Sequence, residues 1–126
     1  MLVNVPVAVG ELFDKITILR IKADRLVDPA KVANVRRELE ALEAVARDVP
    51  ASEQLDGLVA ELTAINAGLW DVEDGKRAHE REGRFDDAFI TLARRVYKEN
   101  DERAAIKRRI NELTGSTLME EKSHAG

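Results

Sequence analysis

Apolar side chains recur at helical spacing along two long stretches of the chain, at about 53–82 and 86–114. In both stretches the steps between apolar positions alternate between three and four, which is typical of a helix that packs along another helix. These positions are Leu55, Leu58, Leu62, Ile65, Leu69 and Val72, and then Phe85, Phe89, Leu92, Val96, Ile106, Ile110 and Leu113. The two stretches therefore predict a long antiparallel helical hairpin.

Two shorter amphipathic stretches precede the hairpin. The first, at about 10–26, is apolar on two sides, which indicates a helix that is buried on two sides, either at the centre of the protein or at a subunit interface. The second, at about 29–48, follows Asp28-Pro29, where Asp28 can cap the helix and the missing N–H of proline costs nothing. We therefore predict an all-α protein, a four-helix, mostly antiparallel bundle.

Start and stop signals set the expected bounds of the elements. Ser52 and Asp86 are suited to capping helix N-termini, and Gly83 and Gly115 to ending helices. Pro6 disfavours a helix before it and indicates an extended arm or edge strand. The predicted organisation is a single helical domain over 1–126, with an arm at 1–9, helices at about 10–26, 29–48, 53–82 and 86–114, and a tail at 115–126.

Composition narrows the function classes. A length of 126 residues fits one domain, and 44% hydrophobic with 35% charged residues is typical of soluble helical proteins. A net charge of -4 argues against nucleic acid, and the absence of cysteine excludes disulfides and thiolate sites. The N-terminus lacks the features of a secretory signal, and no apolar run approaches the ~20 residues of a membrane-spanning helix. We expect a cytoplasmic protein with neither a membrane nor a nucleic-acid partner.

The apolar pattern of 86–114 is broken at Glu99 and Arg103, and this break predicts a polar layer inside the hairpin. Counting outward from the predicted turn places Glu99 opposite Leu69 and Arg103 opposite Ile65. The flanks of both helices carry further polar and aromatic side chains at the same height. The candidate ligand-binding cluster consists of Trp70, Glu73, Asp74, Arg77, Asn100, Asp101, Arg103 and Lys107.

This cluster allows a structural and a functional interpretation. In the structural one, which we prefer, ion pairs such as Glu73 with Arg94 or Arg95 fix the helix register. In the functional one, Arg103, Lys107 and Arg77 bind a phosphate or carboxylate beside an aromatic wall. Neither interpretation identifies a catalytic residue, and the sequence leaves enzymatic activity undecided.

Glu11 and Asp14 form a second candidate site. Two carboxylates three residues apart share a helix face and could bind Mg²⁺, with Asp71 and Asp74 as the partner pair. Acidic residues also favour the first turn of a helix through the helix dipole. Because the dipole alone accounts for Glu11 and Asp14, we expect no metal or other cofactor.

Five segments spread over nearly the whole chain are VPVAVGELFDKITILRIK, NVRRELEAL, LWDVED, FITLARRVYKENDERAAIKRRIN and EEKS. Together they resemble a family of small bacterial all-helical proteins of unknown function. The resemblance implies a stand-alone cytoplasmic helical domain, with members associated with genes for surface-polysaccharide sugar transfer. It implies no activity for any residue.

Two functions from different classes follow from these patterns. The first, which we favour, is a non-catalytic assembly or accessory module that forms a homodimer. Its interface would combine Ile18 and Ile21, on the second side of 10–26, with a stripe of small residues on 53–82. The second is a small helical enzyme or ligand-binding protein that uses the mid-bundle cluster on a phosphorylated or nucleotide-sugar compound. The small-residue stripe comprises Ala60, Ala64, Ala67, Gly75 and Ala78.

Overall fold

The computed structural model describes residues 1–122 and confirms the all-α prediction. Its four helices are α1 (Val9–Arg25), α2 (Pro29–Ala46), α3 (Glu53–Glu82) and α4 (Asp87–Thr114). No residue of 1–122 lies in a strand, so the edge-strand alternative for the N-terminal arm is wrong, and residues 1–7 are exposed. No helix within the same residues has both the length and the apolar character that crossing a membrane requires.

Side chains and glycines fix the ends of the helices where the sequence predicts them. Asp28, Ser52 and Asp86 each accept a hydrogen bond, of 2.9–3.1 Å, from a backbone N–H in the first turn that follows. Gly83 and Gly115 end α3 and α4 with φ of 65° and 66°, a conformation that residues with a Cβ rarely adopt. The helix bounds therefore follow from local chemistry.

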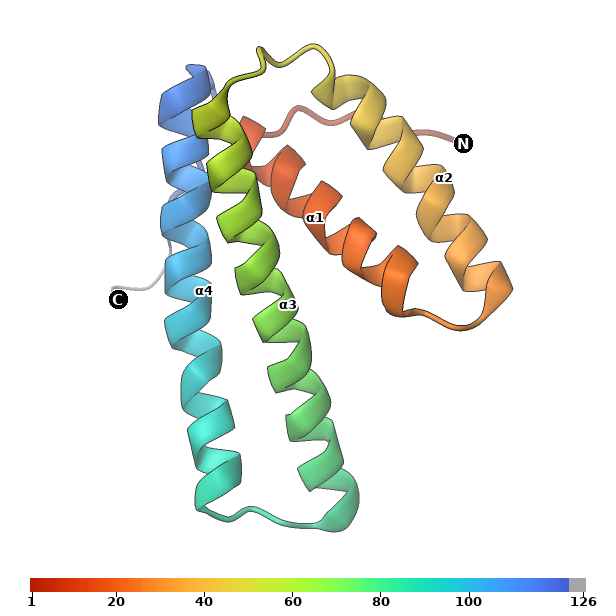
Figure 1. Ribbon diagram of the computed structural model, residues 1–126, viewed down its shortest axis with the longest axis vertical. Helices are drawn as coiled ribbons and strands as arrows, with labels where there is room; N and C mark the ends of the chain where they lie inside the picture. Colours follow the sequence, from red (N-terminus) through yellow and green to blue (C-terminus); the bar gives the residue numbers. More distant parts are fainter. Residues whose placement is uncertain (123–126) are drawn as a thin grey trace.

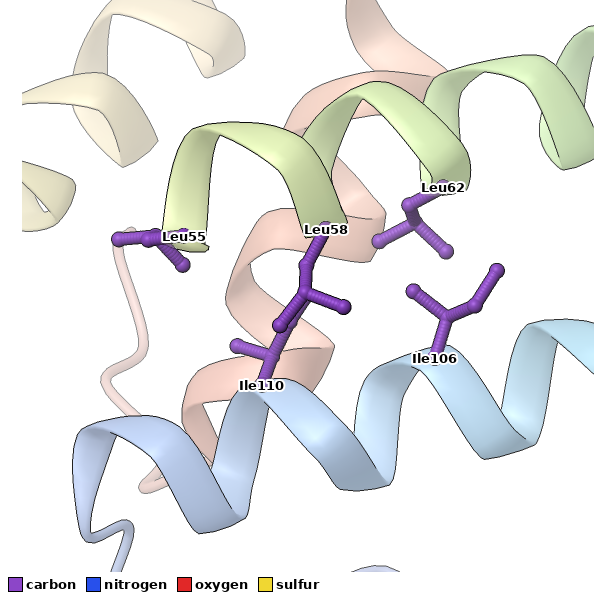
Figure 2. Packing of buried hydrophobic residues seen from close by; sticks show 5 residues of the cluster. All are labelled: Leu55, Leu58, Leu62, Ile106 and Ile110. Carbon is purple, nitrogen blue, oxygen red and sulfur yellow. The ribbon is translucent and has the colours of Figure 1, made fainter. Parts of the chain in front are cut away.

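The main apolar cluster lies between the N-terminal half of α3 and the C-terminal half of α4. Figure 2 shows three leucines of α3 facing two isoleucines of α4 across this interface. Leu62 and Ile110 have no exposed surface, and truncating such a side chain to alanine costs about 2–5 kcal/mol. The cluster comprises Leu55, Leu58, Leu62, Ile106 and Ile110. Five positions of the predicted seam thus form the core of the hairpin, whereas Phe85 and Leu113, which the apolar spacing also placed in the seam, are exposed.

α1 is the central helix. It packs against α2, α3 and α4, whereas α2 packs against α1 alone within the described residues. Figure 1 shows α2 on the outer side of α1, away from the hairpin, and the lower half of the hairpin extending beyond both helices. Ile16, Leu19 and Ile21 are buried. The second apolar side of α1 is therefore partly used within the chain, because Ile21 is buried whereas Ile18 is only half-buried.

α1 approaches α4 closely at Gly10. A Cβ at this position would lie 2.4 Å from the Lys107 carbonyl oxygen and 3.0 Å from Oδ1 of Asn111. The first of these atoms belongs to the backbone and cannot rotate away. Only glycine therefore permits this packing.

We expect Gly10→Ala to lower the free energy of unfolding by about 1–3 kcal/mol, because α1 must move away from α4. Urea denaturation followed by circular dichroism measures this change. Gly57→Ala is the matched control, because no atom lies within 4 Å of its Cβ position. It should stabilise the protein by up to about 1 kcal/mol through helix propensity. A Gly10→Ala chain as stable as the unmodified one would contradict the close packing.

Candidate functional site

The polar centre of the molecule is an ion pair between Asp14 of α1 and Arg103 of α4. The Arg103 Nε donates to Oδ1 of Asp14 at 2.9 Å, and Nη2 donates to Oδ2. The Asp14 side chain is 1% exposed and that of Arg103 is 29% exposed. Because two parallel hydrogen bonds fix both position and orientation, this pair sets how α1 lies on α4.

Asn66 brings α3 to the same carboxylate. Its Nδ2 donates to Oδ1 of Asp14 and to Oγ1 of Thr17, both at 2.9 Å. The Thr17 hydroxyl donates to the backbone carbonyl of Asp14 at 2.8 Å. Within residues 1–122 the only buried side-chain nitrogen or oxygen without a hydrogen-bond partner is Nε2 of His79, near the hairpin turn. The network around Asp14 is therefore satisfied internally.

Lys107 lies one turn further along α4 and collects three carboxylates. Its Nζ lies 2.6 Å from Oε2 of Glu11, 2.9 Å from Oε1 of Glu120 and 3.8 Å from Oδ2 of Asp14. The Lys107 side chain is only 7% exposed. Burial of an ammonium is tolerated because these opposite charges compensate it. α1, α4 and the segment after α4 therefore meet at Lys107.

These contacts shift three pKa values. Burial tends to raise the pKa of Asp14, but hydrogen bonds from Arg103 and Asn66, with nearby positive charge, lower it below 3.8. The hydrogen bond to Asp14 raises the pKa of Arg103 despite burial. Burial tends to lower the pKa of Lys107, yet its glutamate partners raise it above 10.5. All three groups carry charge near neutral pH, and none is poised for proton transfer there.

The end of α4 also caps the start of α1. Ala8 stands at the N-cap position of α1 and provides no side-chain hydrogen bond. The N–H of Gly10 instead donates to Oδ1 of Asn111 at 2.6 Å, and that of Val9 donates to Oγ of Ser116 at 3.2 Å. These acceptors satisfy two donors that a helix N-terminus leaves free. The same end of α4 thus positions both the backbone and the acidic side chains of α1.

A groove of about 390 Å³ lies beside Arg103, between α1 and α3. Arg25 borders it, with its guanidinium carbon 6.0 Å from the Trp70 ring centroid. Within residues 1–122, Lys22, Asp74 and Arg77 form no ion pair. The groove is lined by Ile18, Lys22, Asn66, Leu69, Trp70, Glu73, Asp74, Arg77 and Arg103. It therefore combines an apolar wall with unpaired charges of both signs.

The predicted cluster is spread along a band with Arg103 at its centre. The members that line the groove together with Arg103 are Trp70, Glu73, Asp74 and Arg77. Asn100 and Lys107 line a second depression, of about 360 Å³, again with Arg103. Asp101 lies in neither, and its carboxylate pairs with Lys122 at 2.9 Å. Two depressions, not one pocket, therefore contain most of the predicted residues.

The expected ion pairs between α3 and α4 are replaced by pairs within one helix. Glu73 pairs with Lys76 at 3.4 Å, not with Arg94 or Arg95. Arg95 instead pairs with Glu99 at 3.2 Å. Residues three or four apart on a helix reach each other without any help from tertiary structure. These pairs do not fix the register of the hairpin.

The acidic pair of α1 binds the cationic side chains of α4. Glu11 and Asp14 hold the ammonium and guanidinium groups described above, and Asp71 pairs with Arg25 at 2.7 Å. Within residues 1–122, no three His, Asp or Glu side chains are arranged to hold a metal ion. Asp14 and Asp71, which the sequence offered as weak candidates for a shared Mg²⁺ site, thus belong to separate ion pairs.

The predicted cluster leaves out three residues of this centre: Thr17, and also Asn66 and Asn111, which lie on the polar flanks of the two long helices. Both asparagines stand in the middle or last third of a long helix, where asparagine is a poor helix former. That mismatch between residue and position is the signal that could have identified them. The residues of α1 that these two asparagines contact could not be deduced, because α1 is far from both asparagines in the sequence.

Comparison with known proteins gives one finding. A family model described as a family of unknown function (DUF6165) matches residues 3–126, nearly the whole chain. No match was found among curated proteins or among solved structures.

We expect Asp14→Asn to lower the free energy of unfolding by about 3 kcal/mol near neutral pH, because Arg103 keeps its charge but loses its counter-ion. Asp24→Asn is the matched control, since it removes the same charge from an exposed position of α1. Its effect should stay within about 0.5 kcal/mol. Urea denaturation of both variants measures the difference.

The cost of Asp14→Asn should also depend on pH. A carboxyl whose pKa is lower in the folded state contributes stability above its unfolded pKa and loses it as the pH falls through the folded value. The difference from the unmodified chain should therefore be constant near neutral pH and shrink below pH 3.8. A difference that persists unchanged in acid would contradict an ionic origin.

Proposed function

The chain belongs to the DUF6165 family, a family of unknown function, and we propose that it acts as a non-catalytic assembly module that forms a homodimer. The observation that carries this proposal is the groove beside Arg103, which offers an apolar wall and unpaired charges of both signs. Aromatic and arginine side chains in such surfaces are typical anchors of protein interfaces.

The ion pairs that Asp14, Arg103 and Lys107 form in the polar centre support a non-catalytic role. Catalytic acids and bases need a proton that can leave or arrive near neutral pH. Asp14 has a lowered pKa, while Arg103 and Lys107 have raised ones. These directions favour stable charge, which suits a group that holds helices together.

The charge pattern of the groove supports a second copy of this chain as the partner. A two-fold interface places one surface against itself, so a surface with charges of a single sign would repel its copy. The groove carries the cationic side chains of Lys22 and Arg77 and the anionic side chain of Asp74. Opposite charges can therefore meet across the axis, around the apolar contacts of Trp70.

The proposed interface differs in part from the one that the sequence suggests. Gly75 of the small-residue stripe faces a leucine of α4, and Ile21 is buried inside the chain. Ile18 lines the groove, and Ala60 and Ala64 remain exposed. We therefore centre the interface on the groove.

We further propose that the module works in the bacterial cytoplasm alongside surface-polysaccharide biosynthesis. The support is the resemblance of the five sequence segments to bacterial proteins associated with such genes. A net charge of -4 gives no support to a nucleic-acid partner.

Ile18→Glu should raise the dimer dissociation constant at least tenfold, because it places a charge on the apolar wall of the groove. Sedimentation velocity over a concentration series measures the change, with circular dichroism to verify folding. Val27→Glu is the matched control, since Val27 is 91% exposed and lies outside the groove. An unmodified chain that sediments as a monomer of 14.0 kDa at every concentration would refute the dimer.

A ligand-binding protein or small helical enzyme is the second candidate, and the size of the groove favours it. A volume of about 390 Å³ falls within the range of about 300–1,000 Å³ that is usual for small-molecule sites. Trp70 could stack on a base or sugar ring, while Lys22 and Arg77 could bind phosphate. The candidate ligand is a phosphorylated or nucleotide-sugar compound.

A thermal-shift panel of sugar phosphates, nucleotide sugars and Mg²⁺ tests this second candidate. A ligand at 100 times its dissociation constant should stabilise the chain by about 2.7 kcal/mol, and Trp70→Ala should abolish the shift. Tyr97→Ala is the matched control, because Tyr97 is exposed and outside the groove. We expect no shift with Mg²⁺ alone. A panel without any shift would contradict ligand binding but not the dimer.

A further inference from the structure

We propose that residues 116–122 form a displaceable strap over a binding site for acidic peptides on α4, in which Glu120 takes the place of a partner's carboxylate. The site would accept a segment with two consecutive acidic residues followed by a basic one. It shares Arg103 with the groove, but the inference does not depend on the proposed dimer.

The strap is held against α4 by three successive ion pairs. They join Glu120 to Lys107 at 2.9 Å, Glu121 to Arg108 at 3.3 Å, and Lys122 to Asp101 at 2.9 Å. Each charge of the strap therefore meets an opposite charge on the helix. α4 thus recognises the order acidic, acidic, basic.

At the Glu120–Lys107 ion pair, the residue of α4 is buried and the residue of the strap is exposed. Lys107 is held from α1 by Glu11 and Asp14 and is 7% exposed, so its ammonium stays in place without the strap. The Glu120 side chain is 48% exposed and that of Glu121 is 77% exposed. Exposed ion pairs contribute little and are screened by salt. The site is therefore permanent, whereas the strap is attached weakly.

Empty space flanks the strap on both sides of Glu120. One depression of about 360 Å³ includes Arg103, and another of about 260 Å³ includes Arg108, while Ala104 and Lys107 line both. The strap crosses this hollow without filling it. Both depressions share Ala104, Lys107 and Glu120, so a partner that replaces Glu120 would have Arg103, Lys107 and Arg108 within its reach.

Intramolecular binding hides this site from a partner. The strap is covalently tied to α4, so its effective concentration is far above that of a free peptide. An external acidic segment must displace it, and its apparent affinity falls by the fraction of time that the strap is docked. Weakening the strap without touching Lys107 should therefore raise the affinity for an external peptide.

The test uses a fluorescently labelled peptide of residues 115–122, GSTLMEEK, and the full-length chain. Fluorescence anisotropy compares its affinity for the unmodified chain and for Glu120→Gln/Glu121→Gln. We expect the variant to bind severalfold more tightly, because a weaker strap is docked for a smaller fraction of the time, and the binding to weaken as salt is added. A peptide with both glutamates replaced by glutamine should bind at least tenfold less tightly. The matched control Glu40→Gln/Glu80→Gln changes two exposed glutamates outside the strap and should bind like the unmodified chain.

Three outcomes would overturn the proposal. The acidic peptide could bind the unmodified chain and the Glu120→Gln/Glu121→Gln variant with equal affinity, or it could bind neither of them. The glutamine peptide could also bind the variant as tightly as the acidic peptide does. A second variant tests whether the peptide binds at the proposed place on α4. Arg108→Gln, added to the Glu120→Gln/Glu121→Gln chain, alters a side chain that is 50% exposed and should leave the fold intact. It should weaken peptide binding several-fold, and an unchanged affinity would show that the peptide binds elsewhere.

Discussion

The two-point contact between the Asp14 carboxylate and the Arg103 guanidinium decides how this chain is assembled. The α3–α4 hairpin can form from its own apolar seam, but a helix laid across it has many possible positions. A planar group that binds another planar group through two hydrogen bonds permits one orientation, and Asn66 ties the third helix to it. Other positions of α1 are costly, because they would leave a charge buried without its counter-ion and without hydration. The polar centre thus selects one packing among several that the apolar surfaces would tolerate.

The remaining contacts between α1 and α4 act together with that ion pair. At Gly10 the two backbones touch, and the side chain of Asn111 completes the first turn of α1. The ammonium of Lys107 then joins both helices to the segment that follows α4. All of these contacts lie on one short stretch of α4, from Arg103 to Asn111. The stabilising centre and two surface depressions share this region because Arg103 lines both depressions.

Sequence reasoning predicted the helices well, because the signals that define them are local. The spacing of Leu55, Leu58 and Leu62 indicates a packed helix face, and Ser52 and Gly83 mark its ends. It also detected that Arg103 interrupts an apolar seam. It could not find the partner, since Asp14 is 89 residues away and an acidic residue near a helix start has a simpler explanation in the helix dipole. Contacts between distant elements depend on the packing angle of α1, which no local pattern encodes.

The position of α2 has a consequence for how the molecule opens. Among the residues that the structure describes, this helix contains no buried residue and packs against α1 alone. Its detachment therefore breaks one interface and leaves the hairpin with its core intact. Regions with few buried contacts are the first to open in the native state. The backbone amides of α2 should therefore exchange with solvent long before those around Leu62, and the chain should pass through a three-helix form before it unfolds completely.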